Sequence, residues 1–103
     1  MSKLILFYVP NKSKLDAKKL AKHLLEKHLI GCANIFPISS MYWWQDKIEE
    51  GNEVVLIAKT TQEKASETEK AIKKIHPYST PCIIKIKTEV NKEYFEWIKS
   101  ELS

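Results

Sequence analysis

Three side chains in this sequence are of the types that bind transition metals: His76, Cys32 and Cys82. Neutral imidazole suits Cu(II) or Zn(II), whereas a thiolate suits softer ions such as Cu(I). Each also has a plainer interpretation, because a histidine before proline can cap a helix end and a free cysteine is usually a small buried residue. His23 and His28 are interpreted as helix-surface and helix-end residues.

No arrangement of residues typical of catalysis is present. The sequence has no Ser/His/Asp order, no glycine-rich phosphate loop and no H-E-x-x-H motif. With only two glycines, a phosphate cradle built from backbone amides is not expected. We therefore predict a binding protein and not an enzyme.

The composition favours a single cytoplasmic domain that spans residues 1–103. The formal charge is +4 but every basic residue is lysine, and nucleic-acid recognition relies on the bidentate contacts of arginine. No apolar run approaches the ~20 residues of a membrane span, and the N-terminus lacks a cleavage-site pattern. Two cysteines without a secretion signal indicate reduced thiols. Nucleic acids and membranes are therefore not expected as partners.

The first half of the chain is predicted to form a strand, a helix and two further strands. These elements must position the side chains named above. An aliphatic and aromatic run predicts a strand over Leu4–Pro10. A capping pattern at Ser13 predicts the start of a helix, and Gly31 is the residue expected to end it. Cys32–Gln45 and Lys47–Thr60 are predicted as long strands joined by a tight link, which makes an unusually long hairpin.

The second half of the chain predicts one more strand and two more helices. Gly51-Asn52 predicts a bulge or a kink inside the second strand of the hairpin. Thr60–Glu63 is another helix-start pattern, with Thr60 as the expected cap, and this helix is expected to run to about Ile75, before a His-Pro pair. Cys82–Thr88 is predicted as a fourth strand, and Asn91 as the cap of a short last helix.

The predicted order is β-α-β-β-α-β plus a short helix, which is the ferredoxin-like α+β arrangement. Two helices would cover one face of a four-stranded antiparallel sheet, and the other face would be open. Yet the strands are apolar on both sides: in the first strand, Leu6 and Tyr8 alternate with Ile5 and Phe7. An uncovered apolar face is an association site, and further copies of the chain are its simplest cover.

Two adjacent tryptophans, Trp43 and Trp44, stand beside the tight link of the hairpin. Strand alternation places Tyr42 and Trp44 on one side of this arm and Trp43 on the other. These rings would be exposed to solvent in a monomer, but they would act as anchors between subunits. We therefore expect the arm to engage a neighbouring copy of the chain.

Several short motifs occur in the order and at the spacing of one known family. They are Cys32-Ala33-Asn34, the S-x-Y-x-W pattern of Ser40–Trp44, Lys47–Glu50, Glu53-Val54, Lys59-Thr60, His76-Pro77-Tyr78 and Tyr94-x-x-Trp97-Ile98. The sequence resembles the divalent-cation tolerance (CutA) proteins over essentially its whole length. This resemblance implies a ferredoxin-like fold, a tightly packed homotrimer similar to the PII signalling trimers, and a link to metal tolerance and copper binding.

The resemblance also implies where a site would lie. Seven residues are expected at a subunit interface or cleft: Tyr42, Trp43, Trp44, Glu53, Lys59, Tyr78 and Trp97. Many members have glutamate where this chain has Ser79 and Cys82, so the family's metal site is not carried over whole. His76 with a cysteine is the remaining candidate, and Cys32 could meet Cys82 only between subunits, because the predicted strand order places them at opposite sheet edges.

Three hypotheses for the function follow. The first is a trimer that binds copper or another divalent cation in metal tolerance. The second is a PII-like trimer that binds a small anionic ligand between subunits and signals to another protein; this hypothesis rests on fold analogy. The third is a purely structural trimer that serves assembly or anchoring.

Overall fold

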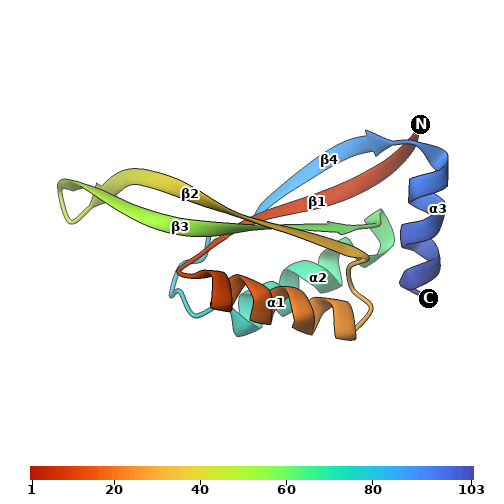
Figure 1. Ribbon diagram of the computed structural model, residues 1–103, viewed down its shortest axis with the longest axis horizontal. Coiled ribbons are helices and arrows are strands. Elements are labelled where there is room, and N and C mark those ends of the chain that lie inside the picture. Colours follow the sequence, from red (N-terminus) through yellow and green to blue (C-terminus); the bar gives the residue numbers. More distant parts are fainter.

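Four strands form one antiparallel sheet with the order β2-β3-β1-β4. The computed structural model describes all residues from Met1 to Ser103. Its elements are β1 (Ser2–Asn11), α1 (Lys14–Glu26), β2 (Cys32–Trp44), β3 (Lys47–Thr60), α2 (Gln62–Ile75), β4 (Ile84–Val90) and α3 (Lys92–Glu101) (Figure 1). The predicted ferredoxin-like order, the long hairpin and the extra C-terminal helix are thereby confirmed.

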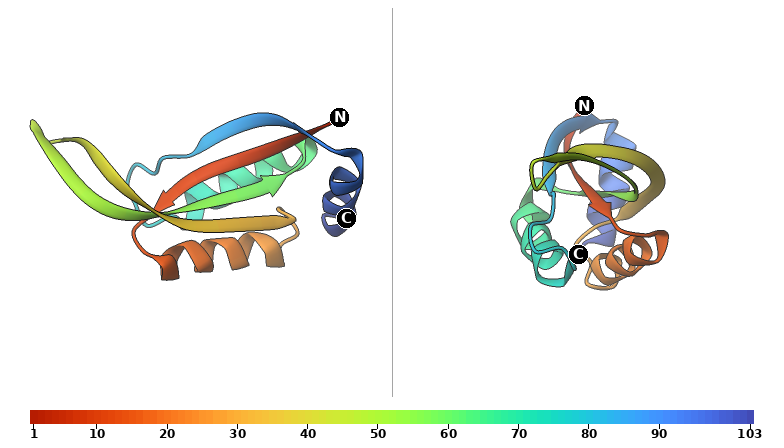
Figure 2. Two further views of the ribbon diagram at one scale, coloured as in Figure 1. Left: turned by 45° about the horizontal axis from the view of Figure 1, so that its top comes forward. Right: turned by 90° about the vertical axis from the view of Figure 1, so that its left-hand side faces the viewer.

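Helices α1 and α2 lie side by side against one face of the sheet (Figure 2). Alternate side chains of the central strands point into this layer, and their burial against both helices makes the main core. The core consists of Ile5, Phe7, Val9, Leu20, Ala21, Leu24, Leu29, Ile30, Leu56, Ala58, Ala65 and Ile72.

The second face of the sheet is covered at one end only. There α3 buries Ile98 and Leu102 against Leu4, next to the half-buried Cys32. Beyond α3 this face stays apolar and open, with 47% of Ile84, 38% of Ile86 and 37% of Phe36 exposed. The structure thus confirms the prediction that two helices leave an apolar sheet face uncovered.

The hairpin of β2 and β3 extends beyond the helices as an arm, which gives the molecule a longest dimension of 46 Å (Figure 1). Its register runs without interruption from Cys32 opposite Lys59 to Trp44 opposite Lys47. The bulge predicted at Gly51-Asn52 is therefore wrong. The arm turns at Gln45 and Asp46, which both have positive φ (49° and 63°), as a tight two-residue turn requires.

The ends of α1 differ in part from the prediction. Ser13 is the N-cap and accepts a 3.1 Å hydrogen bond from the backbone N–H of Asp16, as predicted. The helix ends at Glu26, however, and His28 takes the left-handed conformation (φ 55°) that was expected of Gly31. Gly31 instead lies close to α3: a Cβ atom there would lie 3.2 Å from two side-chain carbons of Ile98.

Two other predicted boundaries are shifted. The N-cap of α2 is Thr61 and not Thr60. Thr60 is the last residue of β3, and its hydroxyl donates a 2.6 Å hydrogen bond to the buried carbonyl of Leu29. The fourth strand begins at Ile84, so Cys82 lies in the loop before it. Asn91 is the N-cap of α3, as predicted.

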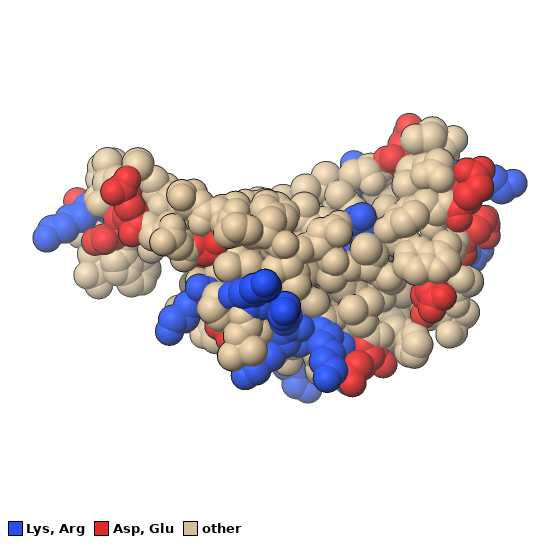
Figure 3. All heavy atoms as spheres, in the orientation of Figure 1, with Lys and Arg blue, Asp and Glu red and all other residues tan.

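Charges are distributed unevenly over this framework. Lysines gather over α1, whereas acidic side chains lie over α3 and near the tip of the arm (Figure 3). No helix has the length and apolar character needed to cross a lipid bilayer.

Candidate functional site

A cleft of about 590 Å³ lies where the arm leaves the body of the domain. We call it the hairpin-base cleft. Residues from the end of β1, from both strands of the arm and from the loop between α2 and β4 line it. It brings together five of the residues expected from the sequence to form a site: Tyr42, Trp44, Glu53, Tyr78 and Cys82.

Glu53 is the only carboxylate of this cleft, and two hydroxyl groups hold it. Ser40 Oγ donates to Glu53 Oε1 at 2.7 Å, and the Tyr78 hydroxyl donates to Glu53 Oε2 at 3.1 Å. Burial, followed by the hydrogen bond and negative charge of Glu53, raises the pKa of Tyr78 to about 12. Tyr78 is therefore a protonated donor at neutral pH and keeps the carboxylate in a fixed position.

His76 lies behind this cleft and is only 7% exposed. Its Nε2 lies 2.9 Å from the carbonyl oxygen of Pro10, and its Nδ1 accepts the backbone N–H of Tyr78 at 3.2 Å. Since a carbonyl can only accept, Nε2 carries the proton. The ring also packs edge-on against Tyr78, with centroids 4.7 Å apart. A metal ion at His76 would have to replace one of these two hydrogen bonds.

The two cysteines are free, and the strand order separates them. Cys82 is exposed in the hairpin-base cleft, whereas Cys32 begins the edge strand β2 near α3. No group of three or more His, Cys, Asp or Glu side chains lies close enough to hold one metal ion. A single chain therefore does not form a complete metal site with these ligand types.

A second group of expected residues lies at the other end of the open face, beside α3. Lys59 Nζ lies 3.4 Å from the hydroxyl of Tyr94, and Cys32 is paired with Lys59 across the ladder. Trp97 packs on Tyr94 with ring centroids 5.6 Å apart. Burial and then the Cys32 thiol raise the pKa of Tyr94. Tyr94 was not expected in the site, although it belongs to the same short motif as Trp97.

These two groups do not share a cleft within one chain. Lys59 and Glu53 are six residues apart on β3, which corresponds to about 20 Å along an extended strand. Trp43 belongs to neither group: it lies on the far side of the arm and is 73% exposed. A cleft lined by both Lys59 and Tyr78 would need residues of more than one subunit.

The fold and the site together define a class of protein: a ferredoxin-like domain with an overlong hairpin arm and a ligand cleft at the base of that arm. The family described as "CutA1 divalent ion tolerance protein" matches residues 5–101. The chain belongs to this family.

Individual relatives agree over nearly the whole chain. A "Divalent-cation tolerance protein CutA" of Archaeoglobus fulgidus is 46% identical over 92 residues, which are 88% of this chain and 90% of the relative. The protein of the same description from Thermotoga maritima is 42% identical over 102 residues, which are 96% of this chain and 99% of the relative.

Solved structures show the same architecture. The crystal structure of CutA1 from Ehrlichia chaffeensis superposes with a TM-score of 0.95 at 37% identity and covers 100% of this chain and 98% of its own. A structure described as the periplasmic divalent cation tolerance protein CutA from Archaeoglobus fulgidus gives 0.92 at 42% identity, and covers 97% of this chain and 99% of its own.

Proposed function

We propose that this chain forms a homotrimer that binds copper or another divalent cation and contributes to metal tolerance without catalysing a reaction. The observation that supports the assembly best is the arm, on which Trp43 and Trp44 are 73% and 59% exposed. Large exposed aromatic side chains next to an open apolar sheet face are typical of surfaces that another subunit covers. Membership of a divalent ion tolerance family supports the link to metal ions.

The proposed metal site lies at a seam between subunits. One chain lacks a group of three suitable donors, so a second subunit must complete the site. The hairpin-base cleft offers the Cys82 thiol and the Glu53 carboxylate from one chain. A thiolate favours copper over hard cations. Free cysteines persist in reducing compartments, so we propose that the protein acts in the cytoplasm.

Copper titration of the trimer tests this proposal. Cys82→Ser should weaken Cu(I) binding, because it removes the one soft ligand of the cleft. Cys32→Ser is the matched control for the thiol at the other end of the sheet. Sedimentation in the same samples should show trimers for all three proteins. A monomer, or equal copper affinity for wild type and Cys82→Ser, would remove the hairpin-base cleft from the proposal.

A second candidate function is the binding of a small anionic ligand. Lys12, Ser79 and Thr80 line the wall of the hairpin-base cleft beside Tyr78, and an ammonium group with hydroxyls suits a carboxylate or phosphate. A panel of anionic metabolites, tested by thermal shift in the presence of a chelator, separates this function from metal binding. An unchanged melting temperature with every metabolite would count against it.

A further inference from the structure

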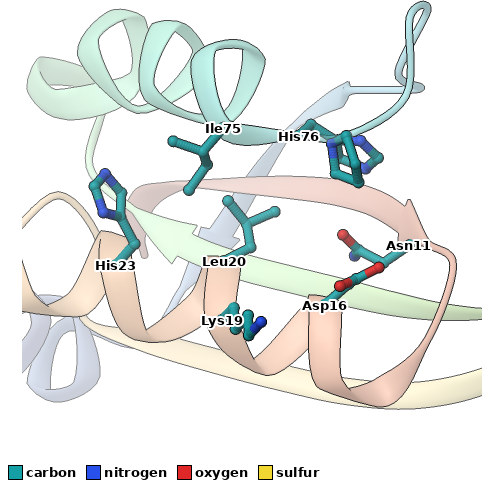
Figure 4. Close-up of a pocket in the computed structure, with 8 residues that line it drawn as sticks. Asn11, Asp16, Lys19, Leu20, His23, Ile75 and His76 are labelled. Atoms are coloured by element: carbon teal, nitrogen blue, oxygen red, sulfur yellow. The ribbon is translucent and has the colours of Figure 1, made fainter.

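A second pocket lies on the helical side of the sheet, between α1 and the C-terminal end of α2. We call it the interhelix pocket. It has a volume of about 330 Å³, and Figure 4 shows the residues that line it. Its residues come from the end of β1 (Asn11), from α1 (Asp16, Lys19, Leu20 and His23) and from the end of α2 (Ile75, His76 and Pro77). None of its residues except His76 belongs to the sites described above.

Asn11 contributes an unpaired acceptor to this pocket. The residue is 1% exposed, and its Nδ2 donates to the carbonyl oxygens of Val9 at 2.9 Å and Val54 at 3.4 Å. Both partners can only accept, so the orientation of the amide is fixed. Its Oδ1 is consequently left buried without a donor. A buried acceptor without a partner is unfavourable, which makes this atom a site for a ligand that donates.

The surroundings of Asn11 favour a positively charged donor. Asp16 lines the same end of the pocket, and its carboxylate makes no ion pair within the chain. The C-terminal end of α2 faces the pocket as well, and the negative end of a helix dipole stabilises cations. Two oxygen acceptors and a helix C-terminus together suit an –NH₃⁺ group, which has three N–H donors.

We propose that the interhelix pocket binds a small molecule with one primary ammonium group. The ammonium donates to Asn11 Oδ1 and to the Asp16 carboxylate, and the carbon chain of the ligand lies against Leu20 and Ile75. Lys19 follows Asp16 by one turn of α1, so its positive charge disfavours a diamine. The same charge attracts a ligand carboxylate, which makes a free amino acid a suitable ligand. Because Oδ1 is shielded from solvent, neighbouring side chains move aside as the ligand enters.

Three probes of similar size test the proposal: ethylammonium, L-alanine and propionate, each at up to about 50 mM with a chelator present. The readout is the side-chain amide resonance of Asn11 in ¹H–¹⁵N NMR spectra. Ethylammonium and L-alanine should shift this resonance with saturation, and propionate should leave it in place. No shift with either amine, or an equal shift with propionate, would overturn the proposal.

Asp16→Asn tests the second contact. The Asp16 backbone N–H, and not its side chain, bonds to the Ser13 cap, so the helix start is retained. Loss of a charge-assisted hydrogen bond should weaken binding of both amines by about tenfold or more. Glu26→Gln removes the same charge at the other end of α1 and should leave the affinity unchanged. Equal affinities for wild type and Asp16→Asn would contradict the proposed contact with the carboxylate.

Discussion

The phenol of Tyr78 donates a 3.1 Å hydrogen bond to the carboxylate of Glu53. This contact joins the loop after α2 to the base of the hairpin arm. The same loop is held from behind, because the backbone N–H of Tyr78 bonds to His76, which in turn bonds to Pro10 at the end of β1. Hydrogen bonds therefore link three segments where the arm leaves the domain: the loop after α2, the base of the arm and the end of β1.

Tyr78→Phe should destabilise the protein by about 1.5–3 kcal/mol, the usual range for a hydrogen bond to a charged group. The ring and its packing on His76 are kept, so the change isolates the hydroxyl. Urea denaturation of wild type and variant measures the difference. Ser40→Ala, which removes the other donor to Glu53, is the matched variant for the same carboxylate. Identical midpoints for wild type and Tyr78→Phe would show that this bond does not hold the loop.

The Tyr78 hydroxyl should also make stability depend on alkaline pH. Its pKa is raised to about 12 by burial and by Glu53, from an ordinary value of 10.0. A group with a raised pKa in the folded state contributes stability that is complete below its unfolded pKa and declines as pH rises through the folded value. The stability difference between wild type and Tyr78→Phe should therefore shrink between about pH 10 and 12.

Melting temperatures of both proteins over this pH range provide the measurement. All other side chains are common to both proteins, so the difference between them isolates the phenol. A difference that stays constant to the end of the range would contradict the raised pKa.

Gly31→Ala should destabilise the contact between the β2 start and α3. The new Cβ would lie 3.2 Å from both Cγ atoms of the fully buried Ile98, and overpacking of a core contact costs about 1–3 kcal/mol. Gly51→Ala is the control, since nothing lies within 4 Å of a Cβ there. Thermal unfolding of the two variants should separate them clearly. Equal losses of melting temperature in the two variants would mean that α3 shifts to accommodate the new Cβ atom without a loss of stability.

Trp44→Ala should weaken the proposed trimer, because it removes a large aromatic anchor from the arm. For a ring buried between subunits the loss is about 3 kcal/mol per site. Sedimentation over a dilution series compares the variant with wild type. Leu15→Ala serves as a control, since this exposed apolar residue lies on α1 and is not part of the arm. A variant that stays trimeric to the same dilution as wild type would show that Trp44 is not an anchor.

The order of elements could be predicted because it depends on local patterns. Alternating apolar residues and the capping signal at Ser13 act over a few positions, and the structure follows them. The roles of Gly31 and Thr60 could not be predicted in this way, because they depend on distant partners. Gly31 makes room for Ile98, and the hydroxyl of Thr60 bonds to Leu29. Neither partner is visible in the local sequence.

The candidate site could be predicted only in part for the same reason. The resemblance pointed to Glu53 and Tyr78, which the fold does bring together. It gave no reason to place Lys59 and Trp97 at the opposite end of the sheet, beside α3. Asn11 was missed entirely, since an asparagine after proline at a strand end is typical of a turn. Its importance arises from the Val54 carbonyl, which fixes its amide from the neighbouring strand.

The position of β1 at the centre of the sheet constrains how the chain is made. Ser2, near the N-terminus, pairs with Val90, near the C-terminus. The hairpin of β2 and β3 joins neighbours in sequence and can close while the chain is still growing on the ribosome. The N-terminal strand can pair with β3 during synthesis but must wait for its second partner until β4 has been synthesised. Such a long-range closure slows folding, and the open edge of β1 stays exposed to other chains in the interval.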